Sequence, residues 1–243
     1  SMNQLIADMN AGLVKVLVML EGNPVFNTPA DLDFAGALAQ VPVRVHLSDR
    51  ANETSNYCHW TVPAAHFLES WGDLRGHDGT ISLVQPLILP LYQGRTASEL
   101  VALLLGDANP DGHLLLQDYW RETRGAEGFD RFWQAALSQG VIPDSTPAGS
   151  AVSVAAVPAA SDYAAQQNLD IVFRTDPAII DGRYANNGWL QEIPRPLTLL
   201  TWDNALFMHP ATALKYHVEH EDLVEVEFGG RKVTAPVMIQ FGH

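Results

Sequence analysis

The chain has 243 residues, of which 47% are hydrophobic and 17% are charged. This length and apolar content allow one large domain or two modest ones. With 14 basic against 28 acidic side chains, the composition argues against nucleic acid or an anionic membrane surface as a partner. The single cysteine, Cys58, excludes an internal disulfide and a cluster site built from this chain's cysteines alone.

The first apolar run, residues 13–20, is the segment around which we expect the first domain to form. It predicts a buried strand, followed by a tight turn at 21–24 and a helix that begins after Thr28-Pro29. Because the run is apolar on both faces, it is typical of a central parallel strand covered by helices on each side. A second apolar run at 41–47 predicts a parallel neighbour, joined by a right-handed βαβ crossover.

The tripeptide Gly22-Asn23-Pro24 lies where this first strand ends. In open α/β sheets ligands bind beyond the carboxyl ends of the strands, and a glycine lets the backbone come close to a ligand. The same tripeptide also forms ordinary turns. The sequence therefore leaves two interpretations open, a ligand-binding loop and a plain turn.

Residues 58–73 hold the densest group of chemically capable side chains in the chain. The nominal metal ligands among them have spacings that match no zinc pattern, and Pro63 interrupts any helical register. We favour a second interpretation, the wall of a crevice whose side chains hydrogen-bond to loop backbone. The residues expected in this wall are His59, His66, Glu69, Trp71 and Asp73.

Between this segment and the middle of the chain, helices predominate. Pro86 and Pro90 make residues 81–91 extended, more typical of a crossing segment than of a sheet strand. A capping box at Thr96 predicts a helix that ends near Gly106. Two amphipathic helices are expected at 113–123 and 128–139. Their aromatic residues have the spacing of a helix core: Trp120, Phe129, Phe132 and Trp133.

Residues 143–165 are rich in Ala, Ser, Val and Pro and predict a linker between an α/β domain at 1–142 and a smaller domain at 166–243. The smaller domain is predicted to be mostly β and barrel-like. We expect strands at 169–174 and 197–201, a short helix at 210–216, and a hairpin formed by 223–228 and 232–239. Because Gly242-His243 follow a strand-like run directly, we expect a truncated domain within a longer protein.

Several stretches, in this order, resemble the molybdopterin oxidoreductase family. VMLEGNPVFNTPADLD at 18–33, VPAA at 62–65 and ESWG at 69–72 are similar to the family's late α/β domain. PATA at 210–213, DLVEV at 222–226 and VTAPV at 233–237 are similar to its final dinucleotide-binding β-barrel domain. The resemblance covers nearly the whole chain apart from 143–165.

Other stretches resemble one branch of that family, the molybdopterin-like iron–sulfur subunit of alternative complex III. They are CHW at 58–60, HFLESWGD at 66–73, NGWLQE at 187–192 and TWDNA at 201–205. This resemblance implies a periplasmic subunit of a quinol-oxidising respiratory complex, held at the bacterial inner membrane through partner subunits. It implies no cofactor in this part of the chain, and iron–sulfur clusters in a C-terminal part of the parent protein.

The family resemblance also implies which residues would face a molybdopterin dinucleotide, as functional or vestigial positions. They are Gly22, Asn23, Pro24, Asn27, Asp49 and Asn204. Two departures weigh against dinucleotide binding: Glu221 precedes Asp222 where relatives have Gly, and Cys58-His59 replace Ala-Asp. An added carboxylate beside a phosphate site is electrostatically unfavourable.

Three functions follow as hypotheses. The first is a non-catalytic scaffold with no catalytic or metal-ligating residues of its own, in a respiratory electron-transfer complex. The second is a fragment of an active oxidoreductase that depends on molybdopterin guanine dinucleotide. The third is an unrelated α/β protein that binds a small molecule beside Gly22. Within the first, proton transfer by Glu69 or Asp73 is a further hypothesis.

Overall fold

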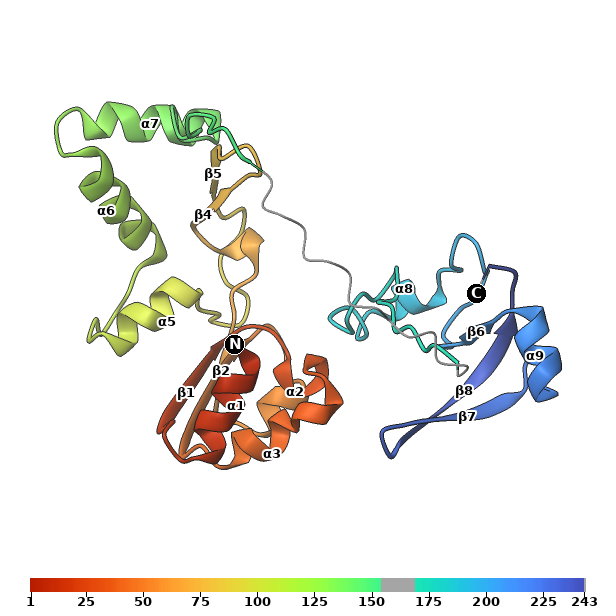
Figure 1. The fold of residues 1–243 in the computed structure, drawn as a ribbon. Helices are drawn as coiled ribbons and strands as arrows, with labels where there is room; N and C mark the ends of the chain where they lie inside the picture. The colour runs from red at the N-terminus through yellow and green to blue at the C-terminus, as the bar shows by residue number, and fades with distance from the viewer. Residues whose placement is uncertain (154–168, 243) are drawn as a thin grey trace. The chain divides into compact units, whose positions relative to one another are not determined.

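The computed structural model describes residues 1–153 and 169–242, which divide into two compact units (Figure 1). The first unit is Ser1–Leu169 and the second is Asp170–His243. Most of the predicted linker, residues 154–165, lies outside the described residues. Each unit contains β-sheet of its own.

The first unit begins with a three-stranded parallel sheet in the order β1-β2-β3. Val16 of β1 pairs with Val43 of β2, and Val45 of β2 pairs with Trp60 of β3. The predicted parallel βαβ unit is therefore confirmed. The elements of this part are α1 (Met2–Asn10), β1 (Val16–Leu20), α2 (Pro24–Asn27), η1 (Ala30–Leu32), α3 (Phe34–Ala39), β2 (Val43–Ser48), α4 (Glu53–Asn56) and β3 (Trp60–Pro63).

A core of apolar side chains joins α1 and α3 to one face of this sheet. Met9 and Leu38 are fully buried in it, and Met19 of β1 is 8% exposed. The prediction that helices cover both faces of the first strand is wrong for the described residues, which place helices on one face. The physical reason is topological: both crossovers advance in the same direction, and crossovers of one hand then lie on one side of the sheet.

The local structure after the first strand also differs from the prediction. The helix expected directly after Thr28-Pro29 begins at Phe34, because Asp33 has a left-handed backbone (φ 42°) and caps α3 by accepting a hydrogen bond from the Gly36 amide. The predicted turn contains the start of α2, whose first residue is Pro24. Neither α1 nor β3 was predicted from the sequence.

The rest of the first unit packs helices against a two-stranded antiparallel sheet. Its elements are η2 (Phe67–Glu69), β4 (Gly72–Arg75), β5 (Ile81–Val84), α5 (Ala97–Leu104), α6 (Gly112–Arg124) and α7 (Phe129–Gln139). The prediction that 81–91 is not a strand is wrong for its first part. Pro86 lies beyond the end of β5, so it removes no hydrogen bond from the sheet.

The helix predictions in this region are confirmed. Thr96 and Glu99 form the predicted capping box, in which each side chain accepts a hydrogen bond from the other residue's amide. Gly140 follows α7 in the left-handed conformation (φ 72°). Trp120 and Trp133 are 4% and 5% exposed, as expected for core residues.

The second unit contains α8 (Gly188–Glu192), β6 (Leu206–Met208), α9 (Pro210–Tyr216), β7 (Leu223–Phe228) and β8 (Arg231–Ile239). The predicted hairpin and short helix are confirmed: β7 and β8 pair around Gly229-Gly230, both with positive φ, as a two-residue hairpin turn requires. In residues 170–242 the strands form an open sheet in the order β6-β8-β7, because three strands are too few to close a barrel.

Two predicted strands of this unit are wrong. Residues 197–201 form a turn in which Leu199 has φ 60° and its amide donates to the Arg195 carbonyl. Residues 169–174 form no regular element and pair with no strand in the described part of the chain. Both segments have strand-like composition, and the tertiary context overrides it.

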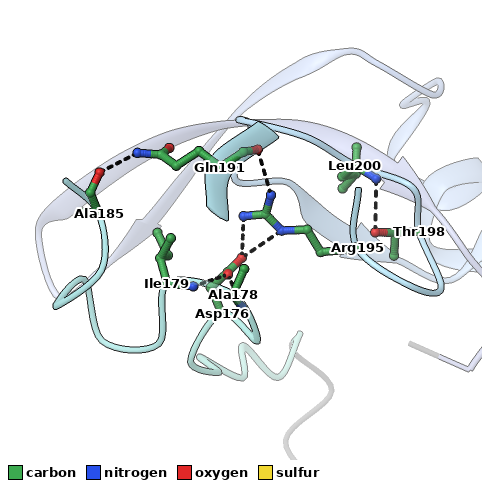
Figure 2. A network of polar contacts seen from close by, with 8 residues as sticks. All are labelled: Asp176, Ala178, Ile179, Ala185, Gln191, Arg195, Thr198 and Leu200. Carbon is green, nitrogen blue, oxygen red and sulfur yellow. Dashed lines mark hydrogen bonds and ion pairs between the residues drawn. The ribbon is translucent and has the colours of Figure 1, made fainter. Parts of the chain in front are cut away.

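A buried arginine holds the loops of the second unit together (Figure 2). Arg195 is 8% exposed and donates to Asp176 Oδ2 through Nη2 (2.9 Å) and Nε (3.3 Å). Burial opposes ionisation of Asp176, but hydrogen bonds from the Ile179 amide, Arg195 and the Ala178 amide outweigh it and lower the pKa of the carboxyl. The pair therefore joins the loop at 176–179 to the loop after α8.

Candidate functional site

The carboxyl ends of β1 and β2 meet at one edge of the parallel sheet, and the loops that follow them form a connected polar network. The first loop runs from Glu21 to Asn23 and leads into α2. The second runs from Asp49 to Asn52 and leads into α4. We call these two loops, with the first turns of α2 and α4, the carboxyl-edge site. In α/β sheets this is the place where ligands bind.

Asn23 links the two loops of the carboxyl-edge site. Its Nδ2 donates to Glu53 Oε2 (2.6 Å), and its Oδ1 accepts from the amide and the hydroxyl of Thr54 (3.2 and 2.7 Å). The Thr54 hydroxyl in turn accepts from the Val25 amide (3.0 Å). Both polar atoms of the Asn23 side chain are therefore used within the protein rather than directed at a ligand.

His46 of β2 adds two further hydrogen bonds to the same network. It is fully buried on β2, and its Nε2 lies 3.1 Å from the Gly22 carbonyl oxygen, while Nδ1 lies 3.0 Å from Ser55 Oγ. Because a carbonyl can only accept, Nε2 carries the proton and Nδ1 accepts from the Ser55 hydroxyl. Burial is the largest influence on this imidazole and lowers its pKa, against the opposing effects of the Gly22 carbonyl and Asp49.

Asn52 completes the second loop. Its Oδ1 accepts from the Ser55 amide (3.1 Å), which caps α4, and its Nδ2 donates to Ser48 Oγ (3.3 Å). Ser48 donates to the Arg50 carbonyl (2.7 Å). The two loops are thus held by hydrogen bonds that the chain supplies itself.

The charge at this edge is negative. Glu21, Asp49 and Glu53 are all exposed acidic residues in the two loops and at the start of α4. The hydrogen bond from Asn23 lowers the pKa of Glu53, so its carboxyl is ionised at neutral pH. The basic side chain of these segments, Arg50, lies 3.8 Å from Asp49. The edge would repel a phosphate group.

The structure brings together most of the residues predicted to face a cofactor. Gly22, Asn23 and Pro24 form the first loop and the start of α2, Asn27 is the last residue of α2, and Asp49 directly follows β2. Asn204 is an exposed residue of the second unit, so its part in the site stays a prediction. The predicted residues on the first unit thus share one edge of the sheet.

Sequence reasoning missed the residues that organise this edge. They are His46, Ser48, Asn52 and Ser55, together with the hydrogen-bonding role of Thr54. One signal was available: polar residues alternate with apolar ones in VRVHLS at 43–48, which predicts a polar row on one face of β2. The hydrogen bonds of Asn52 are local, but those from Thr54 to Asn23 join residues about thirty positions apart, which no local pattern can reveal.

The residues of the predicted crevice wall lie in three places. His59 accepts from the Arg44 amide through Nδ1 (3.2 Å) beside the sheet. His66 is the N-cap of η2, and Glu69 accepts hydrogen bonds from the His66 amide (3.2 Å) and from the Leu91 amide (3.1 Å). The expectation that Glu69 holds loop amides is therefore confirmed.

Trp71 and Asp73 lie elsewhere, in a hollow of about 500 Å³ between β4, α5 and α6. The Trp71 ring lies 4.4 Å from the ring of His113, and Asp73 Oδ2 accepts from Trp120 Nε1 (2.9 Å). Asp73 thus accepts a hydrogen bond from a buried indole N–H and not from a loop amide. In the part of the chain that the structure describes, no three His, Cys, Asp or Glu side chains gather as a metal site requires.

Known proteins resemble this chain in sequence and in fold, although no family model matches it. Over 130 residues, 51% of the chain, it is 28% identical to the menaquinone reductase, molybdopterin-binding-like subunit of Nitratidesulfovibrio vulgaris, and this match spans 19% of that protein. The chain is also similar in structure to acetylene hydratase from Pelobacter acetylenicus, with a TM-score of 0.56 and 14% identity over 98% of this chain and 37% of that one. The chain therefore shares the fold of part of a larger enzyme and resembles, in sequence, a molybdopterin-binding-like subunit.

Proposed function

We propose that this chain is part of a molybdopterin-oxidoreductase-like subunit of a membrane-associated respiratory complex, where it serves as a non-catalytic scaffold without a bound dinucleotide. The similarity to a menaquinone reductase subunit supports the assignment to a quinone-linked complex. The chain spans about a fifth of the length of that relative, so the activity of the whole protein belongs to the proposal.

The observation that carries the proposal is the self-contained carboxyl-edge site. A dinucleotide pyrophosphate is bound by free amide donors and a positive local field. Here the Asn23 side chain is engaged by Glu53 and Thr54, and exposed carboxylates occupy both loops. These residues do not fit a pyrophosphate.

Membrane association would then come from partner subunits. No helix within 1–153 or 169–242 is long and apolar enough to cross a bilayer. Within the proposal, the parent protein is the molybdopterin-like subunit of alternative complex III, on the periplasmic side, and its iron–sulfur clusters lie outside this chain. Proton transfer by Glu69 or Asp73 has less support, because both carboxylates are engaged by hydrogen bonds from the protein.

The second candidate is a fragment of an active oxidoreductase that uses molybdopterin guanine dinucleotide. One observation favours it: a Cβ atom added at Gly22 would meet no atom within 4 Å, so a ligand could approach the backbone there. This candidate requires that residues from outside the chain neutralise the carboxylates of the carboxyl-edge site.

Metal and pterin analysis of the whole native subunit separates the two candidates. The scaffold proposal expects no stoichiometric molybdenum and no released pterin after denaturation. Stoichiometric molybdenum with bound pterin would reject it. A titration with guanosine diphosphate adds a second readout, with Glu53→Gln as the variant that removes a charge at the edge and Glu122→Gln, on the exposed face of α6, as its control. Binding by the wild-type subunit would contradict the electrostatic reasoning.

A further inference from the structure

β1 occupies an unusual place for its composition. It is apolar along its whole length, VLVML, yet it forms an edge of the three-stranded sheet. Edge strands of soluble proteins are usually protected by charges, prolines or bulges. β1 has none of these, which indicates a strand that belongs in the interior of a sheet.

The backbone of β1 shows which groups lie at the open edge. Lys15 accepts at its carbonyl from the Val43 amide (3.2 Å), and the Glu21 amide donates to the Leu47 carbonyl (2.9 Å), so the odd-numbered residues bond to β2. Alternate residues of a parallel strand direct their backbone groups to opposite sides. The amides and carbonyls at 16, 18 and 20 therefore face the open edge, where no strand of the described residues pairs with them.

The same alternation places apolar side chains on the face that lacks helices. Val16, Leu20, Val43 and Trp60 are 56%, 46%, 41% and 69% exposed. The strand register adds further apolar residues to this face, and no polar one between Val16 and Val62. We call this surface the bare face; its residues are Val16, Val18, Leu20, Val43, Val45, Leu47, Trp60 and Val62, of which Leu47 is buried.

The open edge and the bare face have one topological explanation. In β1-β2-β3 the strand order follows the chain order, so all crossover helices lie on one face. A doubly wound sheet continues beyond its first strand in the other direction, and its second set of crossovers covers the opposite face. β1 is then central, as its apolar sequence requires.

We propose that the open edge of β1 receives a further parallel β-strand, whose crossover helix packs its apolar side on the bare face. The strand and helix come from the same subunit, in a segment outside residues 1–243, since the similar menaquinone reductase subunit and acetylene hydratase both extend well beyond the part that this chain matches. This inference rests on the proposed function in one respect, that the chain is part of a larger subunit.

A second copy of the chain fits these surfaces less well. Pairing β1 with β1 of another copy would satisfy the open edge. Each copy carries its helices on the face that is already covered, so the bare face of both copies would stay exposed to water. A strand that is joined to a helix would pair with the open edge, and its helix would cover the bare face. Crossover helices of this kind connect parallel strands.

Residue-resolved hydrogen exchange in the whole subunit tests the proposal. The amides of Val16, Val18 and Leu20 face the open edge, while those of Leu17 and Met19 face β2 and serve as internal controls. If a strand pairs with β1, all five exchange slowly, and the three edge amides are protected by about 100-fold or more relative to exposed loop amides.

Two results would overturn the proposal. One is fast exchange at 16, 18 and 20 while Leu17 and Met19 stay protected. The other is edge protection that appears only as the subunit dimerises with rising concentration, measured by light scattering, since this would assign the edge to a second copy. Neither result depends on the molybdenum content of the subunit, so failure here is distinguishable from failure of the scaffold function.

Discussion

Asn23 is the residue whose loss should most clearly reveal how the carboxyl-edge site is held. Asn23→Ala removes the hydrogen bond to Glu53 and both hydrogen bonds from Thr54. The Glu53 carboxylate is exposed and regains water, so that bond contributes little. Thr54 is fully buried, and its amide and hydroxyl lose their acceptor.

The magnitude follows from these two unsatisfied donors. A buried donor left without a partner costs about 1–3 kcal/mol. Water entering beside the half-buried loop reduces the cost, so we expect Asn23→Ala to lower the free energy of unfolding of the first unit by about 2–4 kcal/mol. Native-state hydrogen exchange of the β1 and β2 amides measures this free energy separately from that of the second unit.

Two variants serve as matched controls. Glu53→Gln keeps an acceptor for Asn23 Nδ2 and should change the free energy of unfolding by less than about 0.5 kcal/mol. Asn56→Ala removes an exposed amide at the end of the neighbouring helix and should have an equally small effect. If Asn23→Ala lowered stability no more than Asn56→Ala, the account of a self-contained edge would be refuted.

Three further predictions concern other buried polar groups. Because burial lowers the pKa of His46 below 6.5, the unfolded chain binds a proton at a higher pH than the folded chain does. The free energy of unfolding should therefore be at its full value above about pH 6.5 and decrease as the pH falls toward the folded-state pKa. Urea denaturation at several pH values should show that the free energy of unfolding has a smaller slope against pH in His46→Gln than in the wild type. Arg195→Met should lower the stability of the second unit by about 2–3 kcal/mol in the same assay, since Asp176 keeps a half-buried charge without its partner. Asp73→Leu should cost about 1–3 kcal/mol by leaving Trp120 Nε1 unsatisfied, with an altered tryptophan emission spectrum.

Each of these predictions has a control of the same chemistry on the surface. His77→Gln replaces an exposed histidine and is the matched substitution control for His46→Gln. Arg183→Met breaks an exposed ion pair with Asp181 and should leave the stability of the second unit almost unchanged. Glu122→Leu on α6 controls for the loss of an acidic residue. An effect of Arg195→Met equal to that of Arg183→Met, an unchanged pH slope for His46→Gln, or a neutral Asp73→Leu would contradict the corresponding prediction.

The features that the sequence predicted correctly have short-range causes. The capping box of Thr96 and Glu99 spans three residues, Gly140 ends α7 by its own conformation, and Gly229-Gly230 form the hairpin turn directly. Each depends on residues that are close in the chain, so composition and spacing were enough to predict the elements around them.

The incorrect strand predictions depend on whether an extended segment finds a partner strand. Residues 197–201 have the composition of a strand, but they find none among the described residues: the Leu199 amide donates to the Arg195 carbonyl and the Arg195 amide donates to the Leu200 carbonyl, which closes a local turn. Conversely, residues 81–84 form a strand because Gly72–Arg75 supplies their partner, despite the prolines that follow. Pairing decides whether an extended segment becomes a strand, and pairing is not written in the segment itself.

The same distinction applies to the function. The order of motifs indicated the molybdopterin oxidoreductase resemblance and located Gly22 and Asn23 at the end of the first strand, because both are properties of the linear chain. Whether that loop is open to a phosphate depends on where the Asn23 side chain is directed. Only the folded chain brings Thr54 and Glu53 against it, because a hydrogen bond across about thirty residues exists once β1 and β2 lie side by side.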